Sequence, residues 1–161
     1  MRSLDDAGVK IRRAVPADAT QIAAVLLESF SEYENLYSTE GFAATTPACD
    51  SILHRMKEGP VWIALLDHSI AGTASVVDRG EDLYIRGMAV LPATRGRGIA
   101  SLLLKRIEDY ASTHSYRRLI LSTTPFLHEA IRLYERFGFS RSQEGPQSLS
   151  GTPLFTMVRN L

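Results

Sequence analysis

Apolar residues recur along the chain with two different periods, and these periods divide it into helices and strands. Near the N-terminus the apolar positions lie three or four residues apart, the spacing of one buried helix face, at Ile22, Val25, Leu26 and Phe30. Between residues 61 and 91 the pattern changes to short apolar runs separated by turn-forming residues, which is typical of strands joined by hairpins. The pattern predicts strands at 9–15, 61–66, 70–77, 83–91, 119–123, 139–143 and 154–159. It predicts helices over 16–31, from Pro47 to Gly59, over 98–113 and from Pro125 to Gly138.

Turn and capping residues set the limits of these elements. Thr46 followed by Pro47 reads as an N-cap and first helical residue, and Gly59 ends that helix. Residues 32–45 and the Gly/Pro/Ser-rich residues 144–153 follow neither period, so both are predicted to be irregular.

The order of the elements predicts one α/β domain with a mixed sheet. A length of 161 residues is typical of a single domain. Three consecutive strands with turn-length links predict an antiparallel meander in the middle of the chain. Residues 1–8 are polar and expected to be a flexible N-terminus, and residues 9–161 form the folded domain.

Composition excludes several classes of protein. The 18 basic and 18 acidic side chains give a formal net charge of zero, without the basic field of a nucleic-acid binder. A single cysteine forms no internal disulfide and favours a reducing compartment. No run of apolar residues approaches the length of a membrane span, and the N-terminus is polar. We therefore expect a cytoplasmic protein with no membrane or nucleic-acid partner, and an exposed strand edge leaves a homodimer open.

The clearest chemical signal lies between the predicted strand 83–91 and the helix 98–113. Two arginines and two glycines, in the run Arg95-Gly96-Arg97-Gly98, lead directly into the helix. A helix start presents unpaired backbone N–H groups and the positive end of the dipole, and glycine lets a ligand approach closely, so this run favours a phosphate group. The alternative is a glycine-rich turn with two solvated arginines. Neither a Walker loop nor a dinucleotide fingerprint fits the run.

The run Arg95-Gly96-Arg97-Gly98-Ile99-Ala100 matches Gln/Arg-x-x-Gly-x-Gly/Ala, which is the pyrophosphate loop of the GNAT superfamily of acetyl-CoA-dependent N-acetyltransferases. Residues 130–139 resemble the last helix of that superfamily and the strand after it, and the element order is similar from residue 9 to 159. The resemblance implies a GNAT-like domain: a mixed, mostly antiparallel sheet flanked by about four helices and splayed between its central strands.

The resemblance also implies acetyl-CoA as co-substrate, and direct attack on it by a primary amine of a small molecule or peptide in a ternary complex. The pyrophosphate would be held by Arg95, Gly96, Arg97, Gly98, Ile99 and Ala100, and the pantetheine arm would lie against the backbone of Met88, Ala89 and Val90. Tyr134 matches the tyrosine that protonates the departing thiolate. Tyr134 lies on the apolar face of its own helix, and this position alone predicts a core residue. The catalytic role is implied by the resemblance.

Two positions depart from the family pattern. Leu127 stands where many members carry an asparagine that contacts the cofactor, which leaves the strength of CoA binding open. Tyr84 stands where many carry a glutamate, so no general base is assigned. These departures keep a second hypothesis open, a non-catalytic acyl-CoA-binding or sensing module on the same fold.

Residues 28–42 mix four glutamates with four aromatic residues, and in the family this region often covers the acceptor site. Such a lining would attract a cationic amine, whereas the alternative is a surface loop whose aromatic residues cover the core. The four histidines lack metal-ligand spacing and there is no Cys/His cluster, so no metal is expected. The identity of the acceptor does not follow from the sequence.

Overall fold

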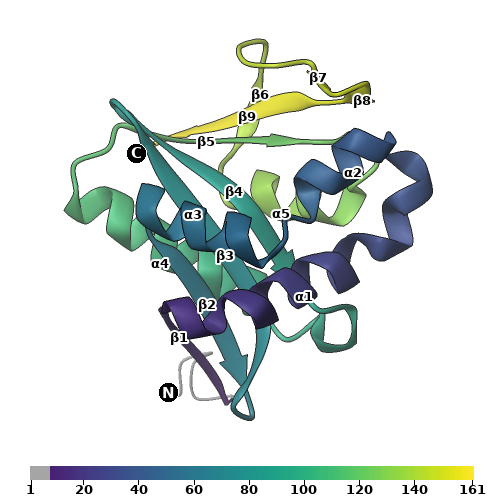
Figure 1. Cartoon of the computed structure of the whole chain (residues 1–161). Coiled ribbons are helices and arrows are strands. Elements are labelled where there is room, and N and C mark those ends of the chain that lie inside the picture. The colour runs from purple at the N-terminus through teal and green to yellow at the C-terminus, as the bar shows by residue number, and fades with distance from the viewer. Residues whose placement is uncertain (1–7) are drawn as a thin grey trace.

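Seven strands form one mixed sheet in the order β1-β2-β3-β4-β5-β9-β6 (Figure 1). The structure is a computed structural model that describes residues 8–161, so the expected flexible segment lies, apart from Gly8, outside the described residues. The strands of the sheet are β1 (Val9–Arg13), β2 (Val61–Leu66), β3 (Ser69–Arg79), β4 (Asp82–Val90), β5 (Arg118–Thr123), β6 (Ser140–Ser142) and β9 (Phe155–Asn160). The pairs β2–β3 and β3–β4 are antiparallel, which confirms the predicted meander, while β4 and β5 are parallel.

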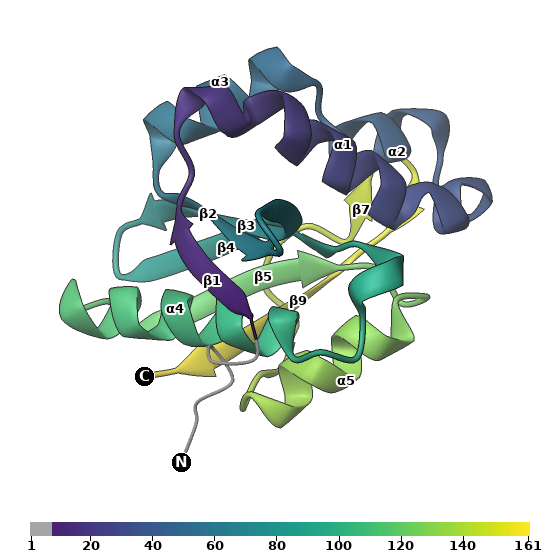
Figure 2. The same ribbon diagram turned by 90° about the horizontal axis from the view of Figure 1, so that it is seen from below.

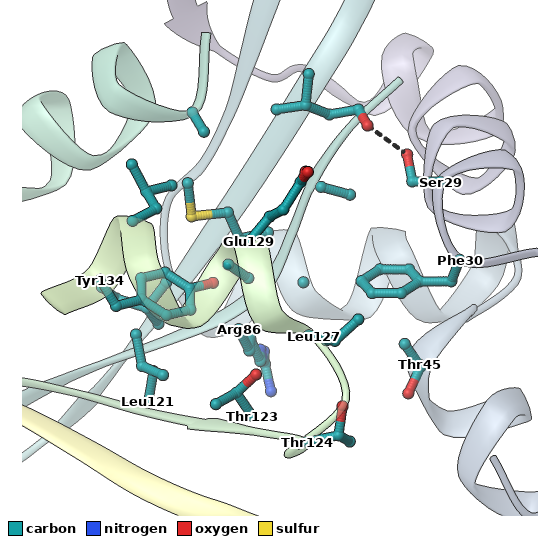
Figure 3. Close-up of a pocket in the computed structure, with 18 of the residues that line it drawn as sticks. Ser29, Phe30, Thr45, Arg86, Leu121, Thr123, Thr124, Leu127, Glu129 and Tyr134 are labelled. Carbon is teal, nitrogen blue, oxygen red and sulfur yellow. Dashed lines mark hydrogen bonds between the residues drawn. The ribbon is translucent and has the colours of Figure 1, made fainter. Parts of the chain in front are cut away.

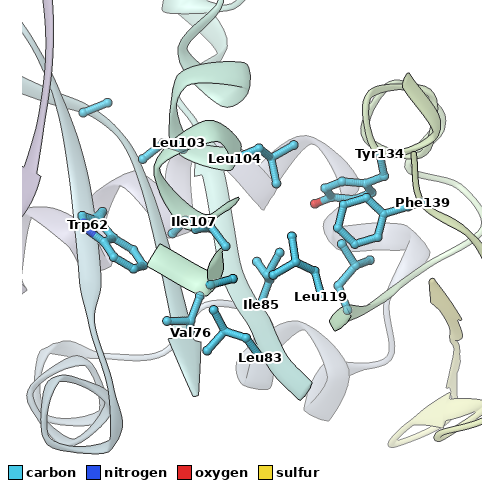
Figure 4. Close-up of a cluster of buried hydrophobic side chains, with 14 of the residues drawn as sticks. Trp62, Val76, Leu83, Ile85, Leu103, Leu104, Ile107, Leu119, Tyr134 and Phe139 are labelled. Carbon is cyan, nitrogen blue, oxygen red and sulfur yellow. The ribbon is translucent and has the colours of Figure 1, made fainter. Parts of the chain in front are cut away.

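Helices cover both faces of the sheet (Figure 2). The helices over one face are α1 (Ala19–Phe30), α2 (Thr39–Thr45) and α3 (Cys49–Glu58), and those over the other are α4 (Ile99–Thr113) and α5 (His128–Arg136). Each face has its own apolar core. Leu103 and Ile107 of α4 are fully buried in one of them (Figure 4), and Ile22 and Leu26 of α1 are buried with Ile52 of α3 in the other. No helix among residues 8–161 is both long and apolar enough to cross a membrane.

The prediction of an irregular segment at 32–45 was wrong. This segment holds most of a 3-10 turn, η3 (Ser31–Leu36), followed by the helix α2. Ser38 is the N-cap of α2, and its Oγ accepts a first-turn N–H at 2.9 Å. Thr46 ends α2 instead of opening the next helix, since its hydroxyl donates to the Phe42 carbonyl at 2.8 Å. The sequence did carry a capping residue at Ser38, but a helix this short shows no clear apolar period.

The segment 144–153, also predicted to be irregular, contains a small antiparallel ribbon of β7 (Ser148–Leu149) and β8 (Thr152–Pro153). The Thr152 hydroxyl accepts a hydrogen bond from Ser38 N at 2.8 Å, so the ribbon is tied to the start of α2. This contact joins two segments that are 114 residues apart in the sequence.

A bulge in β4 opens the sheet in its middle. The register of β3 and β4 shifts where one residue of β3, Ala74, lies opposite two residues of β4, Gly87 and Met88. Gly87 has a φ of 60°, the left-handed conformation that a bulge of this type requires. The pairing of β4 with β5 stops at Ile85, so the rest of β4 has no strand beside it on that edge. The predicted splay between central strands is therefore confirmed, with a bulge as its local cause.

Candidate active site

A cavity of about 670 Å³ lies where β4 and β5 separate (Figure 3). Its walls come from the end of β4, the loop and first turn of α4, the end of β5, α5, and the segment from α1 to α2. Of the predicted site residues, all but one line this cavity: Met88, Ala89, Val90, Arg95, Gly96, Gly98, Ile99, Ala100 and Tyr134. Arg97 is exposed and is not part of the lining.

The start of α4 opens into the cavity without a side-chain cap. Gly98 is the N-cap residue with a φ of 78°, and no side chain accepts a hydrogen bond from the first turn. Gly96 has a φ of 83°, and a Cβ at this position would meet no atom within 4 Å. The first backbone N–H groups of a helix carry its positive dipole end. Because this helix start borders a cavity and has no cap of its own, it can bind an anion through backbone groups.

The two arginine side chains of the loop do not converge on that anion site. Arg95 donates from Nη1 to Glu32 Oε1 at 2.6 Å, and its Nη2 lies 3.4 Å from the Ser29 carbonyl oxygen. This ion pair ties the loop to the end of α1 and to η3. Arg97 is exposed outside the cavity lining. The donors that this helix start offers to the cavity are therefore backbone N–H groups rather than a pair of arginine side chains.

The free edge of β4 presents backbone groups to the cavity. Leu91 N donates to the Ala71 carbonyl of β3 at 2.8 Å, so the N–H of Leu91 points toward β3. Successive residues of a strand direct their backbone groups to opposite edges, and those of Val90 therefore point the other way. The Ser29 hydroxyl confirms this direction, since it donates to the Val90 carbonyl at 3.1 Å from the α1 side. Met88, at the bulge two residues before Val90, lines the same cavity.

Tyr134 belongs both to the core and to the cavity. Its ring is 8% exposed and packs edge-on against Phe139 at 5.8 Å between centroids. Figure 3 shows the hydroxyl pointing toward the inside of the pocket. Burial, with a smaller effect from Tyr37, raises the pKa of Tyr134 to about 12. The phenol is therefore protonated throughout the neutral range and can donate a hydrogen bond to a group in the cavity.

The aromatic residues of the segment 28–42 separate from its acidic residues. Phe30, Tyr33 and Tyr37 line the cavity, and Tyr37 is edge-on to Phe126 at 5.0 Å. None of the four glutamates of this segment is part of the lining: Glu28, Glu32, Glu34 and Glu40. The predicted acidic and aromatic wall is therefore aromatic only, and the expected attraction for a cation has no carboxylate from this segment.

Three arginines that the sequence did not single out line the cavity: Arg55, Arg86 and, at the end of α5, the exposed Arg136. Arg86 lies on β4 just before the bulge, and Arg55 lies on α3. Desolvation lowers the pKa of Arg55, and the positive charge of Arg86 lowers it further. In the sequence Arg55 and Arg86 are single basic side chains 31 positions apart within an ordinary helix and strand, and only the packing of α3 on the sheet brings them together. Leu127, at the position of the usual family asparagine, also lines the cavity and is the N-cap residue of α5.

Within residues 8–161, no three His, Cys, Asp or Glu side chains come close enough together to hold a metal ion. The polar groups that line the cavity are backbone N–H groups, the hydroxyls of tyrosine, threonine and serine residues, guanidinium groups and the carboxylate of Glu129.

Comparison with known proteins assigns the family. The sequence model of the Acetyltransferase (GNAT) family matches residues 23–139. The chain belongs to the GNAT family. This confirms the resemblance that the loop 95–100 and the helix after it indicated, and it makes the protein an N-acetyltransferase.

Individual relatives agree with this assignment. The Escherichia coli (strain K12) protein named uncharacterized N-acetyltransferase YjgM is 29% identical over 136 residues, which is 80% of each chain. N-acetylaspartate synthetase from Danio rerio is 34% identical over 85 residues, which is 52% of this chain and 30% of that protein. The crystal structure of paia N-acetyltransferase from Thermoplasma acidophilum in complex with coenzyme A has a TM-score of 0.78 at 16% identity, and the match covers 95% of this chain and 99% of that one. This GNAT fold confirms the predicted α/β domain with a mixed, mostly antiparallel sheet.

Proposed function

We propose that this GNAT enzyme binds acetyl-CoA along the free edge of β4 and transfers the acetyl group directly to a primary amine in a ternary complex. The observation that carries the proposal is the convergence of three features in one cavity: a strand edge without a neighbour, an uncapped helix start and a buried tyrosine hydroxyl. The Thermoplasma acidophilum relative, which was solved with coenzyme A, supports the choice of co-substrate.

The residues of the cavity fit the chemical groups of coenzyme A. A diphosphate needs several hydrogen-bond donors and a positive potential, and the N–H groups of Gly98, Ile99 and Ala100 at the α4 start supply both. The open space beside Gly96 leaves room for phosphate oxygens to approach the backbone. The amide groups of a pantetheine arm can pair with Met88 and Val90 as an added strand would, because such pairing uses backbone groups alone.

The chain supplies donors for the charges that develop during transfer. The thioester of acetyl-CoA supplies an activated acetyl group, whose carbonyl carbon the amine nitrogen attacks. In this proposal the backbone N–H of Met88, at the bulge beside the gap between β4 and β5, stabilises negative charge on the carbonyl oxygen. Tyr134, which is protonated at neutral pH, donates a hydrogen bond to the departing sulfur.

The acceptor side of the cavity lies under α1 and η3, opposite the start of α4. Phe30, Tyr33 and Tyr37 form an aromatic wall there that excludes water from the reacting groups. A cavity of about 670 Å³ suits a small molecule together with the end of the pantetheine arm. The relative from Danio rerio is named for a small product, N-acetylaspartate, which supports a small amine as acceptor.

The test is an assay of CoA-thiol release over a panel of primary amines, with the acetylated product identified by mass spectrometry. The proposal predicts amine-dependent thiol release and saturable binding of CoA by calorimetry. CoA binding without acetylation of any amine would instead support a non-catalytic acyl-CoA-binding module. Failure to bind CoA would contradict the proposal as a whole.

A further inference from the structure

Two guanidinium groups stand side by side on the acceptor side of the cavity. The residue before Arg86, Ile85, is buried in the core under α4, so strand alternation directs Arg86 to the opposite face, toward α3. The Arg55 guanidinium lies against the same part of β4, beside Gly87. A Cβ added to Gly87 would be only 2.7 Å from Arg55 Nη1. Figure 3 includes Arg86 among the side chains around the pocket.

The protein itself leaves donors of Arg86 unused. Its Nε and Nη2 atoms are buried and have no hydrogen-bond acceptor within residues 8–161. Glu58 Oε1 lies 3.2 Å from Arg86 Nη2 and forms an ion pair with it, but the angle does not allow a hydrogen bond. The Glu58 side chain is half exposed and is not part of the cavity lining. Buried donors without acceptors are costly, and an arginine fork matches the two oxygens of a carboxylate.

The charges on this side are also unbalanced. Arg55 and Arg86 carry two positive charges, while Glu58 is the one carboxylate that acts on this pair. The only acidic residue in the lining, among the described part of the chain, is Glu129, which is exposed on α5 over the other face of the sheet. The repulsion between the two guanidiniums lowers the pKa of Arg55. One further negative charge in the cavity would balance the excess positive charge of the two arginines.

We infer that the acceptor is a small amino carboxylate, such as a free amino acid, whose carboxylate binds to Arg86 with Arg55 beside it. This inference rests on the proposed acetyl transfer and names the substrate class of the same cavity. The diphosphate of CoA is not the anion concerned, because the start of α4 that suits it lies on the other face of the sheet. A purely structural role for Arg86 would make removal of the side chain destabilising.

The inference is tested with pairs of acceptors that differ only at the carboxylate: free amino acids, their carboxamides and the corresponding decarboxylated amines. For the unmodified protein we expect kcat/KM to be at least roughly 30-fold higher for the free amino acid, the effect of one buried charged hydrogen-bonded pair. Equal or faster acetylation of the carboxamides would overturn the inference and leave the acetyltransferase proposal intact. Acetylation of no member of the panel would overturn both.

Substitutions then assign the preference to Arg86. We expect Arg86→Gln to raise the KM for the amino acid by roughly 30-fold or more while changing kcat/KM for the carboxamide less than threefold. Arg86→Lys, which keeps the charge but not the fork, should restore part of the loss. Arg117→Gln, an exposed arginine outside the cavity, is the matched control and should leave both substrates unchanged. An equal loss for both substrates in Arg86→Gln would contradict the assignment.

Thermal unfolding separates binding from folding. Arg86→Gln removes a like charge from beside Arg55 and also the ion pair with the half-exposed Glu58, so its melting temperature should stay close to that of the unmodified protein. A marked fall in melting temperature would show Arg86 to be structural and overturn the inference. The substrate comparison on the unmodified protein remains decisive even if that variant fails to fold.

Discussion

Replacement of Tyr134 by phenylalanine separates the two roles of this side chain. The variant keeps the ring, and with it the edge-on contact to Phe139 at 5.8 Å, and removes only the hydroxyl that points into the cavity. No hydrogen bond to another side chain or backbone group is lost from the described residues, so folding and CoA binding should be preserved. A change in turnover then reports the hydroxyl alone.

The raised pKa sets the size of the expected effect. A phenol with a pKa of about 12 is a weaker acid than an ordinary thiol of about 8.5, so complete proton transfer to a thiolate would be uphill by roughly 5 kcal/mol. Tyr134 therefore acts as a hydrogen-bond donor to the sulfur while its charge develops. A hydrogen bond to a charged group contributes about 1.5–3 kcal/mol. Tyr134→Phe should accordingly lower kcat by about 10- to 100-fold.

The assay follows thiol release at saturating acetyl-CoA, with the dissociation constant for CoA measured separately by calorimetry. Tyr116→Phe is the matched control: the pKa of Tyr116 is also raised to about 12, but its hydroxyl donates to Asp78 at 2.9 Å and does not line the cavity. The control should lose some stability and keep its turnover. If Tyr134→Phe bound CoA normally and turned over within twofold of the unmodified protein, the reasoning on Tyr134 would be refuted.

Three further predictions concern the loop, the bulge and stability in acid. Gly96→Ala and its control Gly80→Ala each place a Cβ in open space, at a φ of 83° and 76° respectively, so each variant should lose about 1 kcal/mol of stability. Only Gly96→Ala should also weaken acetyl-CoA binding, by at least roughly tenfold, as measured by calorimetry. Gly87→Ala would place its methyl group 2.7 Å from an arginine nitrogen at a φ of 60°, and its melting temperature should fall clearly, which a thermal scan checks. The hydrogen bond from Arg159 lowers the pKa of Glu108 below its ordinary value of 4.5. The stability that this hydrogen bond contributes is therefore present above pH 4.5 and is lost as the pH falls through the lowered pKa of Glu108. Urea unfolding between pH 6 and pH 3 should therefore show a smaller loss for Glu108→Gln than for the unmodified protein, by about 1 kcal/mol.

The sequence predicted well those elements in which local pattern and tertiary packing agree. The apolar spacing from residue 98 to 113 corresponds to α4, because one face of that helix is buried in the core. The run at 61–66 coincides with β2, which is buried on both sides along most of its length. The helix α2 was missed since its seven residues bury little apolar surface, and its position depends on contacts with the distant ribbon at Thr152.

In the candidate site, too, the sequence predicted what depends on a local motif and missed what depends on tertiary packing. In the proposed function the residues of the loop 95–100 and Met88 to Val90 act through the backbone, and a local motif was enough to predict the position of all of them in the cavity lining except Arg97. The side chains of the acceptor wall come from separate elements, and their grouping depends on how α1 and α3 pack on the sheet. Local sequence therefore could not show that Glu32, outside the cavity lining, pairs with Arg95, nor that Arg55 and Arg86 both line the cavity.

A crystal structure of the chain with bound coenzyme A tests the central claim most directly. The account predicts the pyrophosphate within hydrogen-bond distance of the backbone N–H groups of Gly98, Ile99 and Ala100, and the pantetheine arm along Met88 to Val90 in the gap beside β5. A pyrophosphate bound beside Arg86 and Arg55, or an arm lying outside the gap between β4 and β5, would contradict it.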